Sequence, residues 1–181
     1  MKEPRPTHYV EYGQKKPFVH IAVFLLLVLG LLWLLFGGRG YKATVKQYVD
    51  ATMDGNARKI VSLMPADYVR TAVEYGEYRN KADIIDDLQM VLNQTNNTYD
   101  EYFGNRWKCE YRIEDTYRYS RDEKDLYFYY NDYAGIEDSV LKIMEVTYSF
   151  EVSGDGNHSG STETLLLYRI GRKWYIGDTL Y

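Results

Sequence analysis

The hydrophobic pattern divides the chain into one continuous apolar run and a longer part in which apolar and polar positions alternate. The run covers Phe18 to Phe36. At about 1.5 Å per residue, a helix of this length reaches roughly 28 Å, close to the ~30 Å thickness of the hydrocarbon core of a bilayer. The pattern therefore predicts a transmembrane helix over 18–36, with the bilayer as its partner.

A cleaved signal peptide is the alternative interpretation of this run. A signal peptide has a shorter apolar stretch, followed by a cleavage site of small residues spaced as in A-x-A. Here the longer run is followed by Gly37-Gly38-Arg39-Gly40. This pattern favours an uncleaved anchor, with a tail over 1–17, a linker over 37–40 and one folded domain over 41–181.

The orientation of the anchor is predicted from charge and from size. Lys15 and Lys16 precede the run, whereas Arg39, Lys42 and Lys46 follow it, so the positive-inside rule favours a cytoplasmic N-terminus only slightly. The tail is too short to fold, and this places the domain outside. We therefore expect a single-pass plasma-membrane protein with a cytoplasmic N-terminus and an extracytoplasmic C-terminal domain.

The first part of the domain has the periodicity of helices. Apolar residues recur at steps of three and four over 41–53 and over 80–97, which predicts two amphipathic helices. Asn56 is a candidate cap for a short helix that ends at Pro65, and Asp67 for a further turn or two. Asn80 with Asp83 resembles a capping box. We expect the last of these helices to fray near Asn96 and Asn97.

The second part of the domain has the period of strands. Trp107, Cys109, Tyr111 and Ile113 alternate with charged residues, and further strands are predicted over 146–152, 162–170 and 173–180. Positions 121–133 fit either a helix or a strand, and their acidic start favours a helix. The predicted fold class is α+β, with about three helices packed on a curved antiparallel sheet of about four strands.

Charge and rare residues narrow the classes of function. The chain carries a formal charge of −4 at pH 7, and its tail is basic, so the domain is more acidic than the whole chain. An acidic domain is unsuited to nucleic acid. The single cysteine, Cys109, excludes an intramolecular disulfide, a thiolate metal cluster and an acylated N-terminus. His8 lies in the tail, His20 in the apolar run and His158 in a glycine-rich loop, so none is placed to act as a base in the domain interior, and histidine-dependent catalysis is not predicted.

The order of the predicted elements, the break at Asp54-Gly55-Asn56 and the closing segment Gly171-Arg172-Lys173-Trp174-Tyr175-Ile176 resemble the nuclear transport factor 2-like cone-fold superfamily. The resemblance is narrower to small membrane-anchored bacterial members. It implies a domain that is concave on one side of its sheet. Members of the superfamily include ketosteroid-isomerase-like enzymes, which need a carboxylate base and tyrosine or acid donors, and also binding or scaffold domains that have neither.

Two other groups of residues are candidates for binding. The chain contains 20 tyrosines, and a tyrosine-rich surface suits a glycan or a peptide. Residues 155–160 imitate the start of a calcium loop, but Leu166 stands where that loop requires a bidentate glutamate, so a hairpin loop is the favoured interpretation. The candidate lining of a concave pocket consists of Trp107, Tyr111, Tyr148, Tyr168 and Trp174.

The function predicted from these observations is binding without catalysis. We expect a membrane-anchored extracytoplasmic domain of the bacterial cell envelope that binds an envelope protein or glycan and needs no cofactor or metal. One alternative is an assembly or scaffold component of a membrane secretion or conjugation complex. Another is an isomerase- or dehydratase-like enzyme, which requires a deep apolar pocket that holds a carboxylate.

Overall fold

The computed structural model describes residues 40–76, 78–131 and 135–177 and the single position 28. The chain divides into two units, Met1–Gly37 and Gly38–Tyr181, and nearly all described residues belong to the second. The predicted tail and transmembrane helix thus lie outside the described residues, apart from position 28. Within the part of the chain that is described, no helix is both long enough and apolar enough to cross a membrane.

The domain is α+β, as predicted, and it has more helices than expected. The helices are α2 (Tyr41–Met53), α3 (Ala57–Ser62), α4 (Ala66–Glu74), α5 (Lys81–Phe103), α6 (Arg121–Asn131) and the 3₁₀ helix η1 (Glu137–Ser139). The strands are β1 (Lys108–Arg118), β2 (Val140–Gly154), β3 (Asn157–Ile170) and β4 (Lys173–Ile176). The expectation of about three helices was too low, because the turns after Pro65 form a full helix and residues 121–131 are also helical.

Side-chain caps begin two of the helices where the sequence predicts them. The side chain of Asn56 accepts a hydrogen bond from a backbone N–H in the first turn of α3, and that of Asn80 accepts two such bonds in α5. The cap predicted at Asp67 is wrong. Pro65 holds the N-cap position of α4, and Asp67 lies in the first turn, where its carboxylate is 2.9 Å from the guanidinium of Arg70.

Helix α5 continues well past the predicted fraying point at Asn96 and Asn97. The Asn96 amide donates a hydrogen bond to the carbonyl oxygen of Met53, 3.2 Å away, so this side chain joins α5 to the end of α2. Phe103, in the last turn, is buried. Tertiary contacts thus outweigh the poor helix propensity of asparagine. The helix ends at Gly104, whose φ of +74° favours glycine.

The strands form an antiparallel sheet in the order β1-β2-β3-β4. With 15 and 14 residues, β2 and β3 make a long hairpin closed by Asp155 and Gly156, both with positive φ, as in two-residue turns of type I′. Both strands begin earlier than predicted. Positions 157–161 are exposed on both faces, so no alternation revealed them. The end predicted for β4, at 180, is wrong, since this strand ends at Ile176.

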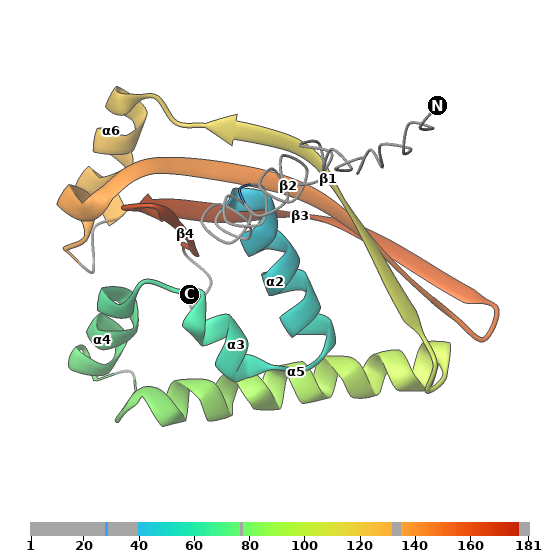
Figure 1. Cartoon of the computed structure of the whole chain (residues 1–181). Coiled ribbons are helices and arrows are strands. Elements are labelled where there is room, and N and C mark those ends of the chain that lie inside the picture. Colours follow the sequence, from blue (N-terminus) through green and yellow to red (C-terminus); the bar gives the residue numbers. More distant parts are fainter. Residues whose placement is uncertain (1–27, 29–39, 77, 132–134, 178–181) are drawn as a thin grey trace, which may run out of the picture. The chain divides into compact units, whose positions relative to one another are not determined.

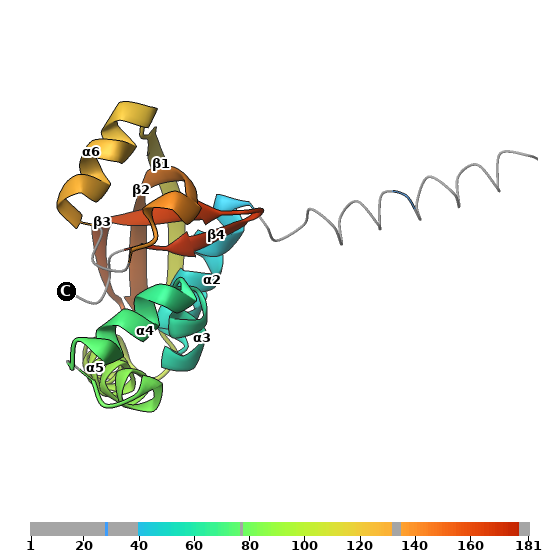
Figure 2. The same cartoon turned by 90° about the vertical axis from the view of Figure 1, so that its left-hand side faces the viewer.

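The two faces of the sheet have different coverings. The inner face of the sheet is the side on which Val146, Tyr148 and Leu167 point toward α2. The outer face is the opposite side. Val45 and Val49 of α2 join the cluster of buried residues on the inner face. Figure 1 shows α5 on the far side of α2 and α3 from the sheet, and Figure 2 shows α6 and α5 at opposite ends of the domain.

Candidate functional site

Three of the five predicted pocket residues lie together on the inner face. Tyr148 is buried in this cluster, and Tyr111 and Trp174 are half-buried against it. The indole ring of Trp174 meets the ring of Tyr41 edge-on, with 6.3 Å between the ring centroids. This part of the inner face is therefore packed by side chains from α2 and all four strands.

The other two predicted residues lie elsewhere. Tyr168 neighbours Leu167 in the same strand and so points to the opposite face, where its hydroxyl is 2.8 Å from that of Tyr127 in α6. Trp107 precedes β1, and its indole N–H donates to the Asp100 carboxylate at 2.9 Å. The five residues thus do not line one common space.

A tyrosine–carboxylate pair lies on the inner face, where the buried part of the sheet ends. Tyr148 of β2 and Glu163 of β3 are directly opposite each other in the antiparallel register. The Tyr148 hydroxyl donates a hydrogen bond of 2.7 Å to Oε2 of Glu163. Tyr148 is buried, with 3% of its surface exposed, whereas Glu163 is exposed. The tyrosine ring therefore belongs to the core, whereas the carboxylate is in contact with solvent.

The charge of Glu163 also acts on tyrosines of two helices. Burial raises the pKa of Tyr48, on α2, and of Tyr99, on α5, and the negative charge of Glu163 raises both further. The pKa of Tyr148 is raised by burial and by its hydrogen bond to Glu163. Of these hydroxyls, that of Tyr148 donates to Glu163. Burial likewise raises the pKa of the free thiol of Cys109, which borders the same region.

Glu163 was not among the residues predicted from the sequence to form a site, and neither were Tyr48 and Tyr99. Glu163 stands in a polar stretch of β3 in which no alternation is visible. A signal was nevertheless present, because Glu163, Leu165 and Leu167 share the parity of one face. The two buried leucines therefore predict that the Glu163 side chain lies on the same face of the strand as they do. No comparable signal relates Tyr48 and Tyr99 to it, since both belong to helices distant in the chain.

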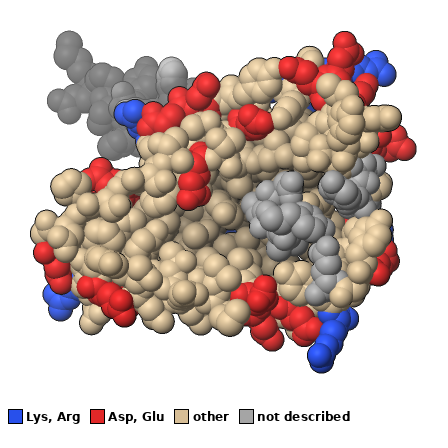
Figure 3. Space-filling view, turned by 180° about the vertical axis from the view of Figure 1, so that it is seen from behind, with Lys and Arg blue, Asp and Glu red and all other residues tan. Residues whose placement is uncertain are grey.

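The surface around the inner face is mostly uncharged. Figure 3 views the domain from behind, with the sheet above and α5 below, and shows a recess between these two layers. Acidic side chains are spread around the periphery of this view, and few basic ones appear there. A ligand that approaches from this side would therefore meet mainly neutral side chains and negative charge.

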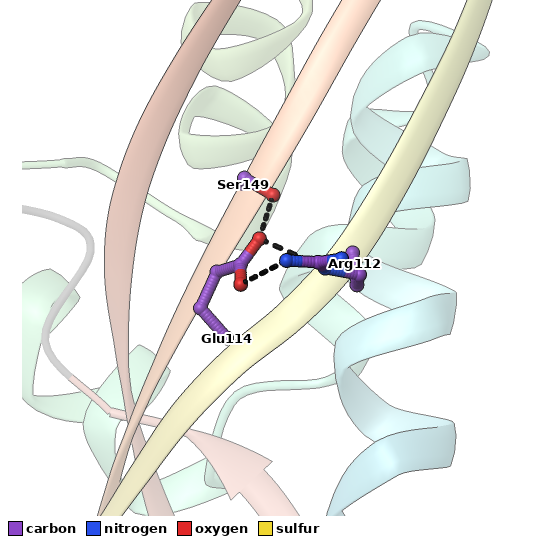
Figure 4. Close-up of polar contacts among 3 residues, drawn as sticks. All are labelled: Arg112, Glu114 and Ser149. Atoms are coloured by element: carbon purple, nitrogen blue, oxygen red, sulfur yellow. Dashed lines mark hydrogen bonds and ion pairs between the residues drawn. The ribbon is translucent and has the colours of Figure 1, made fainter.

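The outer face carries a second carboxylate, and its surroundings differ. The Arg112 guanidinium donates two hydrogen bonds to Glu114, at 3.1 and 2.8 Å, and the Ser149 hydroxyl donates a third at 2.5 Å (Figure 4). Glu114 is the extra residue at a break in the β1–β2 register. The hydrogen bonds from Arg112 and, to a smaller extent, from Ser149 lower the pKa of this carboxyl group. A shallow groove of about 930 Å³ adjoins the network.

The geometry bears on two of the other interpretations. An isomerase needs its carboxylate in a deep apolar pocket, and Glu163 is exposed. The calcium-like segment is a hairpin, as favoured from the sequence, since Asp155 and Gly156 form its turn and residues 157–160 belong to β3. His158 lies on the outer face beside the groove. Within the described ranges, no group of three or more metal-ligating side chains is present.

No protein-family model, curated protein or solved structure matched this chain. The resemblance to the nuclear transport factor 2-like superfamily thus stays a prediction from the order of elements. The site has to be interpreted from its own geometry, in which a buried tyrosine holds an exposed carboxylate on the inner face.

Proposed function

We propose that the chain is a membrane-anchored interaction protein whose extracytoplasmic domain binds an envelope protein through the inner face of its sheet. The observation that carries the proposal is the hydrogen bond of 2.7 Å between Tyr148 and Glu163. The buried tyrosine fixes the carboxylate at the edge of the core, and such pre-orientation lowers the entropic cost of binding.

Two further observations support a binding role without catalysis. The Tyr148 hydroxyl, which donates to Glu163, has a raised pKa, which suits a donor of hydrogen bonds rather than a general base near neutral pH. The carboxylate is open to solvent and therefore accessible to a group from a partner molecule. The anchor rests on the apolar run over 18–36.

A crosslinking experiment tests the binding face. A photoreactive amino acid is placed at Tyr99, which lies within electrostatic range of Glu163, or at Thr162, which is exposed on the outer face, in the full chain in its native membrane. We expect a crosslinked protein from position 99 that disappears with Glu163→Gln, and none from position 162. Equal crosslinking from both faces, or crosslinking insensitive to Glu163→Gln, would show that the inner face is not the binding site.

A labelling experiment tests the anchor and its orientation. In a Cys109→Ser background, a cysteine replaces His8 in the tail or His158 in the β2–β3 hairpin. A maleimide that cannot cross membranes should label position 158 in intact cells and position 8 only after lysis. Labelling of position 8 alone in intact cells would show that the topology is the reverse of the one proposed. Recovery of the chain in the soluble fraction would contradict the proposed anchor.

A further inference from the structure

We infer that three basic residues at one end of the inner face bind the phosphate groups of anionic lipids in the membrane that anchors the chain. They are Arg118 of β1, Lys142 of β2 and Arg169 of β3, and together they are called the basic row. The inference adds a second surface and a second partner to the proposed function, and it rests on that proposal for the anchor.

The register of the sheet brings the members of the basic row together. Lys142 and Arg169 are directly opposite each other in the β2–β3 pairing. Arg118 is opposite Met144, two positions from Lys142, and such diagonal neighbours lie about 7–8 Å apart. Alternate residues of a strand, and residues directly opposite each other, share one face. Because Met144 is buried in the inner cluster, all three basic side chains belong to the inner face.

The chain itself does not neutralise the basic row. Among the described residues, no carboxylate forms an ion pair with Arg118, Lys142 or Arg169. The Nε atom of Arg169 is buried and has no hydrogen-bond partner in the described part of the chain. Three neighbouring positive charges without counter-charges repel one another, and an anion bound between them would relieve this repulsion.

A groove of about 430 Å³ adjoins the basic row. Its charged lining comprises four basic residues and one acidic residue, Arg118, Arg121, Lys124, Lys142 and Asp138. Asp125 lies 3.9 Å from Arg121 and 3.7 Å from Lys124, so it balances part of this charge. Positive charge is therefore in excess at this end of the sheet, although the domain as a whole is acidic.

The start of α2 adds to the positive potential beside the row. The ring of Tyr41 lies 6.3 Å from that of Trp174, and Trp174 is directly opposite Arg169. The first turn of α2 contains no acidic residue, and Gly40 supplies no side-chain cap. The partial positive charge at a helix N-terminus attracts anions. The row and this helix end thus favour the same kind of ligand.

Chain connectivity favours lipid phosphate over other anions. The predicted transmembrane helix ends at Phe36, and the linker over 37–40 spans at most about 14 Å. Helix α2 begins directly after it. Tryptophan and tyrosine are enriched where a bilayer meets water, and Trp174 and Tyr41 lie beside the row. A long polyanion such as nucleic acid would instead meet the acidic remainder of the domain.

The test uses two native tryptophans of the full chain. Trp174 lies at the basic row, and Trp107 precedes β1 at the opposite end of the sheet, as Figure 1 shows for β4 and the start of β1. Their indole N–H signals are followed by NMR in nanodiscs that contain gadolinium-chelating headgroups, made of phosphatidylcholine alone or with about 30% phosphatidylglycerol. We expect phosphatidylglycerol to increase the broadening of Trp174 at least about twofold, and not that of Trp107. Equal broadening of Trp174 in both lipids overturns the inference without any variant.

Two variants locate the effect in the basic row. Arg118→Gln/Lys142→Gln/Arg169→Gln should abolish the dependence on phosphatidylglycerol. Because Arg169 is partly buried, Arg118→Gln/Lys142→Gln leaves it in place and should lose more than about half of the dependence. A native-like spectrum with undiminished dependence in either variant overturns the inference.

A matched control separates the row from the charge of the whole domain. Arg58→Gln/Lys81→Gln/Lys108→Gln removes three exposed basic residues from other elements and should keep the dependence on phosphatidylglycerol. An equal loss in this control would show unspecific attraction and overturn the row as the site.

Inorganic phosphate distinguishes a free anion from a lipid. We expect about 10 mM phosphate at constant ionic strength to leave the Trp174 signal unchanged in phosphatidylcholine nanodiscs, since the attraction comes from a charged surface. A saturable shift of Trp174 that also removes the effect of phosphatidylglycerol would identify a free phosphate as the ligand and overturn the lipid.

The outcomes separate this inference from the proposed function. Crosslinking from position 99 that depends on Glu163, together with Trp174 broadening that is the same in both lipids, would keep the protein-binding face and reject the lipid contact. Broadening that depends on phosphatidylglycerol, without an inner-face crosslink, would keep the lipid contact and reject the protein partner. Recovery of the chain in the soluble fraction would contradict the anchor and overturn the lipid contact with it.

Discussion

The inner and outer faces of the β2–β3 ribbon differ although the same strands form both. Val146, Leu165 and Leu167 on the inner face are at most 3% exposed, whereas Thr162 and Thr164 on the outer face are exposed. Helix α2 packs on the inner side, and α6 covers the outer side only around Ile143 and Tyr168. The comparison shows that the helices determine which positions of these long strands become core.

The two carboxylates extend the comparison to polar groups. Glu114 receives three hydrogen bonds from Arg112 and Ser149 and is satisfied within the chain. Glu163 receives one from Tyr148, and its charge is not paired by any described residue. A satisfied surface ion pair contributes little to stability, whereas an oriented and unneutralised carboxylate is suited to binding a group from outside the chain.

The largest difference between the faces should follow from truncation of an inner-face leucine. Leu167→Ala removes a side chain with 0% exposure and leaves a cavity among the residues of the inner cluster. We expect the free energy of unfolding to fall by about 3 kcal/mol. Thr162→Ala on the outer face should change it by less than about 0.5 kcal/mol. Urea denaturation followed by circular dichroism measures both, and similar losses would contradict the distinction between core and surface.

A smaller difference should separate two glycines of the hairpin. A Cβ added at Gly154, on the inner face, would lie 2.2 Å from the carbonyl oxygen of Phe103, so the end of α5 has to move. We expect Gly154→Ala to cost about 1–3 kcal/mol and to speed amide exchange in the last turns of α5. At Gly160, on the outer face, the closest atom is the Phe150 oxygen at 3.3 Å. Gly160→Ala should therefore lower the free energy of unfolding by less than Gly154→Ala. The reverse order would contradict the close approach of the end of α5 to Gly154.

Removal of the Tyr148 hydroxyl should have a moderate effect that depends on pH. Because Glu163 is exposed and can be hydrated, we expect Tyr148→Phe to cost about 1 kcal/mol at pH 7. The folded-state pKa of Tyr148 lies above its usual value of 10.0. Its contribution to stability is thus fully present below about pH 10 and is lost as pH rises toward the folded-state pKa.

Denaturation at pH 8 and at pH 10.5 measures this dependence. The wild type should lose more stability than Tyr148→Phe between the two pH values. Tyr129→Phe, which changes a ring that is 78% exposed, serves as the control and should follow the wild type. Identical losses in the wild type and in Tyr148→Phe would contradict the assigned hydrogen bond.

The smallest effect should come from the outer carboxylate. Glu114→Gln removes one partner of a surface ion pair with Arg112, and we expect no measurable change in the urea midpoint at pH 7. Its pKa is lowered in the folded state, so any contribution is present above the usual pKa of a glutamate and is lost as pH falls below it. A clear loss of stability at pH 7 would show that the network on the outer face is part of the fold.

Local patterns predicted much of the fold. Three features depend on residues a few positions apart: the helix over 41–53, the caps at Asn56 and Asn80, and the shared, half-buried face of Cys109, Tyr111 and Ile113. The structure confirms all of them. The helical state of 121–131 followed from its acidic first turn. These features are visible in the sequence because helix and strand periods and capping bonds act over short distances.

Tertiary structure alone decided the extent of α5 and the composition of the inner site. Asn96 stays helical because its amide bonds to Met53, and Phe103 because it is buried. The tyrosines of α2 and α5 come within electrostatic range of Glu163 only after helices and sheet have packed. The sequence by itself determined the apolar run, the alternation and the turns, since these depend on neighbours in the chain. Packing between distant segments determined which tyrosine holds the carboxylate, because burial of apolar surface acts regardless of separation along the chain.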